Sequence, residues 1–263
     1  IPLRLVGSEM CIRDRGCVAI VSGANRGIGE AFVRVLMQEG AARVYAGARD
    51  AASAAHLEQE FPDRVQAIRL DVSDPSTIAA AAVACPDVSV VVNNAGAFTN
   101  RLLIGAEDLS GAREEMEVNY FGPVNMARAF APILKTNGGG AILNVLSVGG
   151  ILAAPNMGGY SPSKFAMRAA GACIRAELAG QGTTVTSLIV GSVDTRMAAH
   201  VDGAKATPEE IARAAMRGIT RGTDEIDTDR FAIESRAAMA RDPKGLERQM
   251  AKMVHATNVS TGR

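Results

Sequence analysis

The feature that most constrains this chain is an alternation of short apolar runs with longer stretches of helical period. The apolar runs are rich in β-branched residues, which favours strands. Apolar strands separated by helices are typical of a parallel sheet covered by helices on both faces. The sequence therefore predicts an α/β fold, a Rossmann-like doubly wound domain with a mostly parallel sheet of six to seven strands. The expected strands are 17–23, 42–49, 64–72, 87–96, 141–147 and 183–191, with 223–229 as a candidate for a short last strand.

The expected helices include 28–40, 107–135, 158–180 and 230–254, the last with an interruption near Pro243. No linker rich in proline or serine separates the strands, and 263 residues are enough for one large domain with a real core. We therefore expect a single domain over 17–263. Residues 1–16 lack both the alternation and the apolar stretch of a secretory signal, and we interpret them as an unstructured or non-native lead.

Composition argues against several classes of partner. Lysine plus arginine equals aspartate plus glutamate, 28 against 28, so no net charge favours nucleic acid or an anionic membrane surface. No apolar run is long enough to span a membrane. The cysteines lack paired spacing, which predicts reduced thiols and a cytoplasmic location, and the histidines lack the spacing of metal ligands. These residues are Cys11, Cys17, Cys85, Cys173, His56, His200 and His255.

A glycine-rich turn joins the first strand to the first helix. The sequence VSGANRGIG at 21–29 places Gly23, Gly27 and Gly29 where the chain leaves the strand. A turn without side chains lets the backbone approach a diphosphate, and the N-terminus of the following helix offers free N–H groups. The alternative is a tight turn that binds nothing, because glycine spacing alone is a weak signal.

A tyrosine and a lysine lie one helical turn apart in the sequence YSPSK. Tyr160 and Lys164 are at i and i+4, so their side chains share one helix face. Free tyrosine has a pKa of about 10, and a nearby ammonium group would lower it toward the range useful for proton transfer. Pro162 is compatible with a helix only in its first turn, which places Tyr160 at the helix entrance. Such a pair also occurs on many helices without catalytic function.

Taken in order, these motifs resemble those of the short-chain dehydrogenase/reductase family. The family pattern T-G-x-x-x-G-x-G appears here with Ser22 in place of the threonine. One departure is Val190-Gly191, where the family usually has Pro-Gly beside the nicotinamide. The other matches follow in the family's order over about 17–221: Asp71-Val72, NNAG at 93–96, Asn119 in EVNYFG, Ser147, Tyr160, Lys164 and GSVDTRM at 191–197.

The resemblance implies hydride transfer between a nicotinamide cofactor and a small carbonyl or alcohol substrate. Tyr160 would be the general acid in reduction, and Ser147 would hydrogen-bond the substrate oxygen as negative charge develops. Lys164 would lower the Tyr160 pKa and hold the nicotinamide ribose, and Asn119 would anchor a water in the proton relay to Lys164. From the residues alone, Ser147 could equally be a strand-end hydroxyl and Asn119 a buried amide that satisfies backbone groups.

The end of the second expected strand, YAGARD, indicates which nicotinamide cofactor to expect. The usual acidic position falls on Ala48 and is followed by Arg49, and Arg26 in the glycine turn is a second candidate cation. A guanidinium group suits the 2′-phosphate of NADP(H). The sequence therefore predicts NADP(H) rather than NAD(H). The alternative is that Asp50 binds the ribose and Arg49 is an ordinary solvated residue.

The resemblance also implies the remaining contacts of the dinucleotide. Asp71 and Val72 would flank the adenine and Thr195 would touch the carboxamide or the diphosphate, although Asp71 could instead cap a loop and Thr195 a helix. Asn94 could be purely structural and tie neighbouring strands. The predicted cofactor-binding residues are Ser22, Gly23, Asn25, Arg26, Gly27, Ile28, Gly29, Arg49, Asp71, Val72, Asn93, Ala95, Gly96, Tyr160, Lys164, Gly191, Val193 and Thr195.

The segment after the sixth expected strand is predicted to form a short substrate lid at about 195–210. A helix is expected to begin near Pro208 with Thr207 as its N-cap. Apolar residues here and after Ser147 suggest a mostly apolar pocket for a small or medium ketone or aldehyde, although each could instead belong to the core. The predicted substrate residues are Ser147, Ile151, Leu152, Met157 and Met197.

Three functions compete at this point. The first is an NADP(H)-dependent carbonyl reductase or alcohol dehydrogenase. The second is a non-catalytic dinucleotide-binding regulator on the same fold, against which the presence of Ser147, Tyr160 and Lys164 counts. The third is epimerisation or dehydration, whose enzymes on this fold usually have another glycine spacing and a larger C-terminal domain. The resemblance further implies a homodimer or homotetramer formed through helices 107–135 and 158–180, whose alanine-rich faces could equally pack on the sheet.

Overall fold

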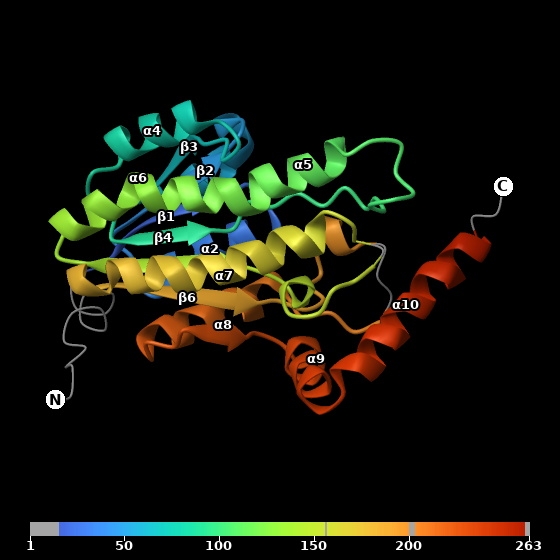
Figure 1. Ribbon diagram of the computed structural model, residues 1–263. Coiled ribbons are helices and arrows are strands. Elements are labelled where there is room, and N and C mark those ends of the chain that lie inside the picture. Colours follow the sequence, from blue (N-terminus) through green and yellow to red (C-terminus); the bar gives the residue numbers. More distant parts are fainter. Residues whose placement is uncertain (1–15, 156, 200–202, 261–263) are drawn as a thin grey trace, which may run out of the picture.

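The computed structural model describes residues 16–155, 157–199 and 203–260. The expected N-terminal lead therefore lies outside the described residues, except for Gly16, and so does the part of the expected lid at 200–202. The described chain forms one central sheet with helices on both of its faces (Figure 1). The predicted α/β, Rossmann-like, doubly wound fold is confirmed.

Seven strands form the sheet, and every neighbouring pair is parallel. Their order is β3-β2-β1-β4-β5-β6-β7, so the direction in which strands are added reverses between β1 and β4. In open parallel sheets, ligands bind beyond the carboxyl ends of the strands at such a reversal. The short last strand is present, and the sheet is parallel throughout. The strands are β1 (Val18–Ser22), β2 (Arg43–Ala48), β3 (Val65–Arg69), β4 (Val90–Asn93), β5 (Gly140–Val145), β6 (Thr183–Ile189) and β7 (Glu225–Asp227).

Helices connect the strands and complete the C-terminal part of the chain. The long helix expected at 107–135 is present as α5, a π-helical turn at Glu117–Phe121 and α6, which follow one another without a break. The helices are α2 (Gly27–Gln38), α3 (Ala55–Glu60), α4 (Pro75–Ala84), α5 (Ser110–Met116), α6 (Gly122–Thr136), α7 (Tyr160–Leu178), α8 (Pro208–Thr220), α9 (Arg230–Arg241) and α10 (Pro243–Ser260), with 3₁₀ turns at Ala51–Ala54, Val148–Gly150, Ala179–Gln181 and Arg196–Ala198.

Two apolar layers cover the two faces of the sheet. Successive residues of a strand point to opposite faces, so Ile20 and Val21 of β1 belong to different layers. The Val21 layer is completed by α2, α3 and α8, with the fully buried Phe32 as its largest side chain. The Ile20 layer is completed by α4, α6 and α7, with Phe130 buried at its centre. Burial of such side chains contributes about 1.5–3 kcal/mol each, which holds the helices on the sheet.

The C-terminal helices α9 and α10 form a third apolar cluster with the middle of α7. Met239 of α9, with Leu246 and Met250 of α10, belongs to the same cluster as buried residues that follow β5 and as Ile189 at the end of β6. The interruption expected near Pro243 is confirmed, because α9 ends at Arg241 and Pro243 is the first residue of α10. Figure 1 shows α9 and the start of α10 on the side of the sheet where the strands end, with the rest of α10 running outward.

The start of α8 is fixed by a reciprocal cap. Thr207 Oγ1 accepts a hydrogen bond from the Glu210 N–H at 3.2 Å, and Glu210 Oε2 accepts one from the Thr207 N–H at 2.7 Å. Pro208 occupies the first helical turn, where its missing N–H has no helical partner to lose. The expectation of Thr207 as N-cap is therefore confirmed, and the lid ends in a rigid element.

The helices, the possible metal ligands and the cysteines are the features for which the sequence predicted no membrane span, no metal site and reduced thiols. None of the helices in the described residues is long and apolar enough to cross a membrane. The same residues contain no group of three or more His, Cys, Asp or Glu side chains that could hold a metal ion. Cys17 and Cys85 are buried free thiols, and burial raises their pKa to about 11 and about 12, so neither is a reactive thiolate at neutral pH.

Candidate active site

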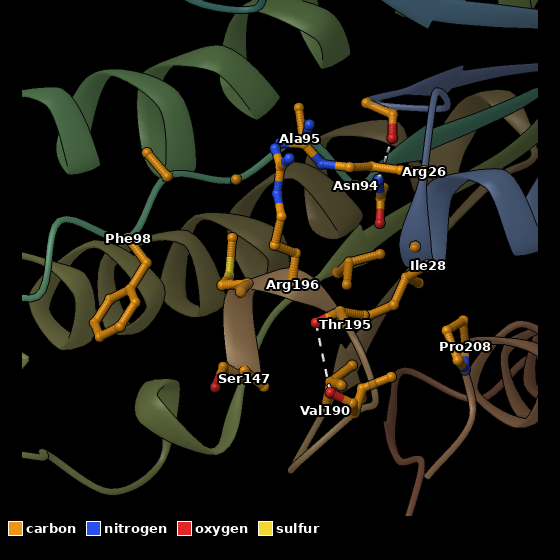
Figure 2. A pocket seen from close by; sticks show the side chains of 18 of the residues that line it. Arg26, Ile28, Asn94, Ala95, Phe98, Ser147, Val190, Thr195, Arg196 and Pro208 are labelled. Atoms are coloured by element: carbon orange, nitrogen blue, oxygen red, sulfur yellow. Dashed lines mark hydrogen bonds between the residues drawn. The ribbon is translucent and has the colours of Figure 1, made fainter. Parts of the chain in front are cut away.

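A cleft of about 2010 Å³ opens at the carboxyl ends of the strands, where the strand order reverses. The glycine turn after β1 forms one wall, and the segments after β4, β5 and β6 form the others (Figure 2). A pocket for one drug-sized ligand usually measures roughly 300–1,000 Å³. The cleft therefore has room for an extended ligand and a second, smaller molecule.

The glycine turn adopts a conformation that side chains would block. Gly23 and Gly27 have φ of +65° and +58°, the left-handed region that glycine enters without a penalty. A Cβ at Gly29 would lie 2.5 Å from Asn94 Nδ2 and would overlap the carbonyl oxygen of Gly23. Gly29 is thus needed to seat α2 against the end of β1, and it does not itself line the cleft.

Ser22 and Asn94 tie the ends of β1 and β4 together. Ser22 Oγ donates to the Val92 carbonyl at 3.3 Å and accepts from the N–H groups of Asn94 and Ala95, both at 3.0 Å. Asn94 Nδ2 donates to the Ser22 carbonyl at 2.9 Å. Asn94 therefore ties the two strands, as in the structural alternative, and it also lines the cleft. Ser22 is buried away from the cleft, so its predicted contact with the cofactor is corrected to support of the turn.

Asn93 also departs from its predicted position at the cofactor. Its side chain is buried beneath the cleft and Nδ2 donates to Asn144 Oδ1 on the neighbouring strand β5 at 2.9 Å. It does not line the cleft because it is the last residue of β4 and its side chain points into the layer under α6 and α7. The predicted residues that do line the cleft are Gly23, Asn25, Arg26, Gly27, Ile28, Arg49, Asp71, Val72, Ala95, Gly96, Tyr160, Lys164, Gly191, Val193 and Thr195.

The alternatives for Asp71 and Thr195 can be compared directly. Asp71 Oδ1 accepts from the backbone and hydroxyl of Ser73, at 3.0 and 2.6 Å, so Asp71 does close a local loop while lining the cleft. Thr195 precedes the 3₁₀ turn at 196–198 but makes no side-chain cap. Its hydroxyl donates to the Val193 carbonyl at 3.4 Å, and its methyl group faces Gly27 across the cleft.

Arginines gather at the end of the cleft that the glycine turn forms. Figure 2 shows the side chains of Arg26 and Arg196 extending toward Ala95 from two different segments of the cleft wall. Arg49 lines the cleft at the end of β2, and among the described residues none of these three arginines has a carboxylate partner. Asp50, by contrast, accepts from the Ala52 N–H at 3.1 Å and caps the 3₁₀ turn at 51–54. Arg196 was not singled out in the sequence, although it stands inside GSVDTRM.

At the other end of the cleft, Ser147, Tyr160 and Lys164 come together. Ser147 follows β5, where its Oγ accepts from the Gly149 N–H at 3.1 Å, and Tyr160 is the first residue of α7. Lys164 is buried and donates from Nζ to the Val145 carbonyl at 3.0 Å. The same Nζ lies 5.6 Å from the centre of the Tyr160 ring. Pro162 falls in the first turn of α7, as predicted.

The protonation of this group differs from the prediction. Burial raises the pKa of Tyr160, hydrogen bonding with Ser147 lowers it, and the charge of Glu115 raises it. Burial also lowers the pKa of Lys164 to about 8. The expected lowering of the Tyr160 pKa by Lys164 is therefore corrected: burial is the largest influence on that pKa, and Lys164 Nζ lies over the ring face and donates to the backbone.

Asn119 sits in the π-helical turn between α5 and α6 and is almost fully buried. Its Oδ1 accepts from the Ala97 N–H at 2.9 Å, and its Nδ2 donates to the Ala97 carbonyl at 2.9 Å and to Ser163 Oγ at 3.0 Å. The side chain thus joins the segment after β4 to α7, as in the alternative of a buried amide, and it does not line the cleft. A water anchored by Asn119 stays a prediction.

The substrate end is mostly apolar. Of the predicted residues, Leu152, Met157 and Met197 line the cleft with Ser147. Ile151 does not: the 3₁₀ turn at 148–150 breaks the strand alternation and places Ile151 in the cluster with Leu146 and Met167, which corrects its assignment to the substrate. Three lining residues that the sequence did not single out are Phe98, Phe231 and Met250.

The loop at Val190-Gly191, where the sequence departs from the Pro-Gly pattern, is held through the backbone of Gly191. The Gly191 N–H donates to Asp229 Oδ2 at 2.7 Å, and Asp229 Oδ1 accepts from the Ala232 N–H at 3.0 Å as the N-cap of α9. A Cβ at Gly191 would overlap the Asp229 carboxylate. The loop beside the cleft is therefore held by a side chain from the C-terminal segment.

The glycine-turn end of the cleft suits a dinucleotide. Arg26 is the N-cap of α2 but makes no side-chain cap hydrogen bond, so the first N–H groups of the helix face the cleft without that partner. Positive φ at Gly23 and Gly27 brings this backbone to the cleft surface. Backbone N–H groups, the helix dipole and nearby arginines are the features that bind a diphosphate.

An all-parallel sheet with a glycine turn at its topological reversal is the architecture of the Rossmann-type α/β proteins. Within that class, the family model described as short chain dehydrogenase matches residues 17–206. The chain belongs to the short-chain dehydrogenase/reductase family.

Individual relatives agree with this assignment. Dehydrogenase/reductase SDR family member 7B of Mus musculus is 32% identical over 197 residues, which cover 71% of this chain and 60% of the mouse protein. The 3-alpha-(or 20-beta)-hydroxysteroid dehydrogenase of Mycobacterium bovis is 33% identical over 205 residues, 76% of each chain. A crystal structure of a short chain dehydrogenase from Burkholderia cenocepacia in complex with NADP has a TM-score of 0.84 and 37% identity, and the match covers 89% of this chain and 97% of that one.

Proposed function

We propose that this chain is an NADP(H)-dependent oxidoreductase that interconverts a ketone or aldehyde and the corresponding alcohol. The observation that carries the proposal is that Ser147, Tyr160 and Lys164 line the same cleft into which the glycine turn opens. A relative named as a hydroxysteroid dehydrogenase and a similar structure in complex with NADP support the same chemistry.

A nicotinamide dinucleotide, when bound, supplies or accepts the hydride. In reduction, Tyr160 donates its phenolic proton to the carbonyl oxygen, because burial keeps the phenol protonated at neutral pH. Ser147 donates a hydrogen bond to the same oxygen as negative charge develops there. The Lys164 ammonium near the ring offsets the charge of the phenolate that remains. In oxidation, Tyr160 takes the alcohol proton, so oxidation favours a higher pH than reduction.

The choice of NADP(H) rests on the arginines. Arg49 lines the cleft just after β2, where the family resemblance implies the adenosine ribose, and a guanidinium group pairs well with a 2′-phosphate. Asp50 is engaged as the cap of the 3₁₀ turn at 51–54, which leaves it less suited to bind ribose hydroxyls. Arg26 and Arg196 extend from two different segments toward Ala95 (Figure 2), and such a pair of like charges is stabilised by an anion beside them.

The substrate is proposed to be an apolar ketone or aldehyde of small to medium size. The residues that line the substrate end include Phe98, Leu152, Met157, Phe231 and Met250, which offer no charge to hold a phosphate or carboxylate group. Apolar lining of this kind binds a hydrocarbon body by removing it from water, while Ser147 and Tyr160 fix the reacting oxygen.

We also propose that the protein is a homodimer or homotetramer formed through the helical segments α5–α6 and α7. Phe121, between α5 and α6, and Phe165 on α7 are 46% and 38% exposed. Burial of these large apolar side chains against a second subunit would be favourable. Light scattering of the protein in solution gives its mass directly, and a monomer at micromolar concentration would contradict the proposal.

The test of function is the oxidation of NADPH and of NADH, followed at 340 nm with a panel of ketones and aldehydes. We expect turnover with NADPH, and a loss of about 10²–10⁴-fold in Tyr160→Phe, which keeps the ring and removes only the proton donor. Dinucleotide binding by the mutant, measured by calorimetry, is expected to match the wild type. Tight binding of both cofactors with no turnover of any carbonyl would support the non-catalytic regulator instead.

A further inference from the structure

Glu115 is a buried carboxylate that the proposed reaction does not use. It lies on α5, is only 1% exposed, and accepts at Oε1 from the Thr99 N–H at 2.6 Å and from Thr99 Oγ1 at 3.0 Å. Its other oxygen, Oε2, is also buried and has no hydrogen-bond partner among the described residues. A buried carboxylate oxygen without a partner is costly, so its surroundings matter.

The Glu115 carboxylate lies against the start of α7. A Cβ at Gly159 would be 2.5 Å from Glu115 Oε2, so the carboxylate and the backbone of Gly159 are in close contact. Gly159 is the N-cap of α7, and this helix has neither a side-chain cap nor an acidic residue in its first turn. The positive end of the helix dipole favours a negative charge at that place. Glu115 therefore supplies from α5 the charge that the sequence of α7 lacks, next to Tyr160.

The same carboxylate holds the segment that follows β4. Phe98 precedes Thr99, and its ring meets the ring of Tyr160 edge to face, with 5.2 Å between centres and an angle of 72°. Phe98 also lines the cleft, on the side away from Arg26 and Ile28 (Figure 2). Because Glu115 binds the backbone of Thr99, it fixes the position of the aromatic side chain that stands beside the phenol.

Three polar side chains of the described residues lie near Tyr160 or act on its phenol. Lys164 of its own helix lies over the ring, Ser147 hydrogen-bonds with the phenol, and Glu115 is the acidic group that acts on it from α5. The charge of Glu115 opposes ionisation of the phenol and so raises the pKa of Tyr160, in the same direction as burial and against Ser147. Geometry and charge therefore both connect Glu115 with the proton donor.

We propose that Glu115 is a positioning residue for Tyr160: its carboxylate anchors Thr99, and with it Phe98, beside the phenol, and it places a negative charge at the start of α7. The inference rests on the proposed function in taking Tyr160 as the proton donor. The anchored Phe98 limits the shape of substrate that can approach the phenol, and the charge adds to burial in opposing ionisation of Tyr160.

The charge is tested by titrating Tyr160 directly, without any substrate. The chain has three tyrosines, so protein labelled with ¹³Cζ-tyrosine gives few NMR signals, and Tyr160→Phe identifies that of Tyr160. Glu115→Gln keeps a carbonyl oxygen for Thr99 and removes the charge, and we expect the Tyr160 titration to move to lower pH. Thr99→Val is the matched control, because it removes one hydrogen bond of Glu115 and leaves the charge; its titration is expected to follow the wild type. A Glu115→Gln curve that overlays the wild type would overturn the assignment.

A second pair of variants covers the case in which Glu115→Gln does not fold. Glu115→Asp and Glu115→Asn have the same shape as each other and differ in charge, and the Tyr160 titration of the asparagine variant is expected at lower pH than that of the aspartate variant. If Tyr160 titrates at the same pH in these two variants, the charge of Glu115 does not act on Tyr160 and the proposal is overturned.

Anchoring is tested by kinetics on the proposed reaction. Thr99→Val and Glu115→Asp both weaken the hold on Phe98, and we expect KM for a bulky aromatic ketone to rise about tenfold with kcat little changed, since a displacement of about 1 Å at a site can cost up to 10²-fold. An unchanged KM would refute the anchoring role. If the wild-type protein reduces no carbonyl, the proposed function fails, while the NMR titration still decides whether Glu115 acts on Tyr160.

Discussion

The two ends of the cleft are built in different ways. The dinucleotide end is made mainly by backbone: one turn at 21–29, with two glycines at positive φ and a third at a close helix–strand contact. The substrate end is made by side chains from separate segments, among them Phe98 after β4, Ser147 after β5, Tyr160 on α7 and Met250 on α10. A backbone site depends on local residues, whereas a side-chain site depends on how distant segments pack. Substitutions at the two ends are therefore expected to fail in different ways.

The largest effect is expected at the dinucleotide end. In Gly29→Ala the new Cβ would overlap the Gly23 carbonyl and lie 2.5 Å from Asn94 Nδ2, and backbone cannot move aside as a side chain can. We expect loss of measurable NADPH binding by calorimetry and destabilisation of about 1–3 kcal/mol, as for an overpacked core. Gly180→Ala is the control, since a Cβ there meets nothing within 4 Å. Normal NADPH binding by Gly29→Ala would contradict the view that the dinucleotide end depends on the backbone of the glycine turn.

The next effect falls on the substrate end and leaves the dinucleotide end intact. Ser147→Ala is expected to lower kcat/KM by about 10²–10³-fold, because one donor to the developing oxyanion is lost, with the Kd for NADPH unchanged. Ser147 lowers the Tyr160 pKa, so its removal raises that pKa. The alkaline limb of the residual reductase activity is therefore expected to move to higher pH, opposite to Glu115→Gln. A shift to lower pH would contradict the assigned hydrogen bond.

A smaller effect is expected from Arg49→Ala, which tests cofactor choice. A hydrogen bond to a charged group contributes about 1.5–3 kcal/mol, so the preference for NADPH over NADH is expected to fall about 10- to 100-fold in kcat/KM. The Kd for NADH is expected to stay as in the wild type. If the variant keeps its preference, and Asp50→Asn instead weakens NADH binding, the ribose alternative for Asp50 is the correct one.

The smallest effect is expected at the cap of α8, outside the chemistry. Thr207→Ala removes the hydroxyl that accepts from the Glu210 N–H, which is expected to cost about 1 kcal/mol, or about 2–4 °C in Tm. Thr207→Ser keeps the oxygen and is expected to retain most of the stability. Thermal unfolding followed by circular dichroism measures both, and an equal loss in the two variants would mean that the capping hydroxyl contributes little.

Features that depend on local sequence were predicted well. Every expected strand is present, and so are the α8 cap at Thr207, the break at Pro243 and the place of Pro162 in the first turn of α7. These features follow from periodicity, capping and proline geometry, which act over a few residues. The glycine turn belongs to the same group, because its backbone conformation is a local property.

Features that depend on packing were not predicted. Ile151 was assigned to the substrate, but a 3₁₀ turn moves it into the core. Lys164 was expected to lower the Tyr160 pKa, but burial dominates once the two side chains are enclosed. Glu115 gave no signal at all, because one acidic residue in the helical segment EEME resembles its neighbours until its burial is known.

The bond between Gly191 and Asp229 has a consequence for engineering the protein. Asp229 is the N-cap of α9 and also binds the Gly191 N–H in the loop after β6. One carboxylate therefore connects the C-terminal helices to the loop beside the cleft. A C-terminal segment borrowed from a relative to change substrate range must therefore bring an equivalent acid at this position. A library that varies residues 230–254 and preserves Asp229 would change the C-terminal helices that line the substrate end. The loop at Gly191 would keep its hydrogen bond and its position.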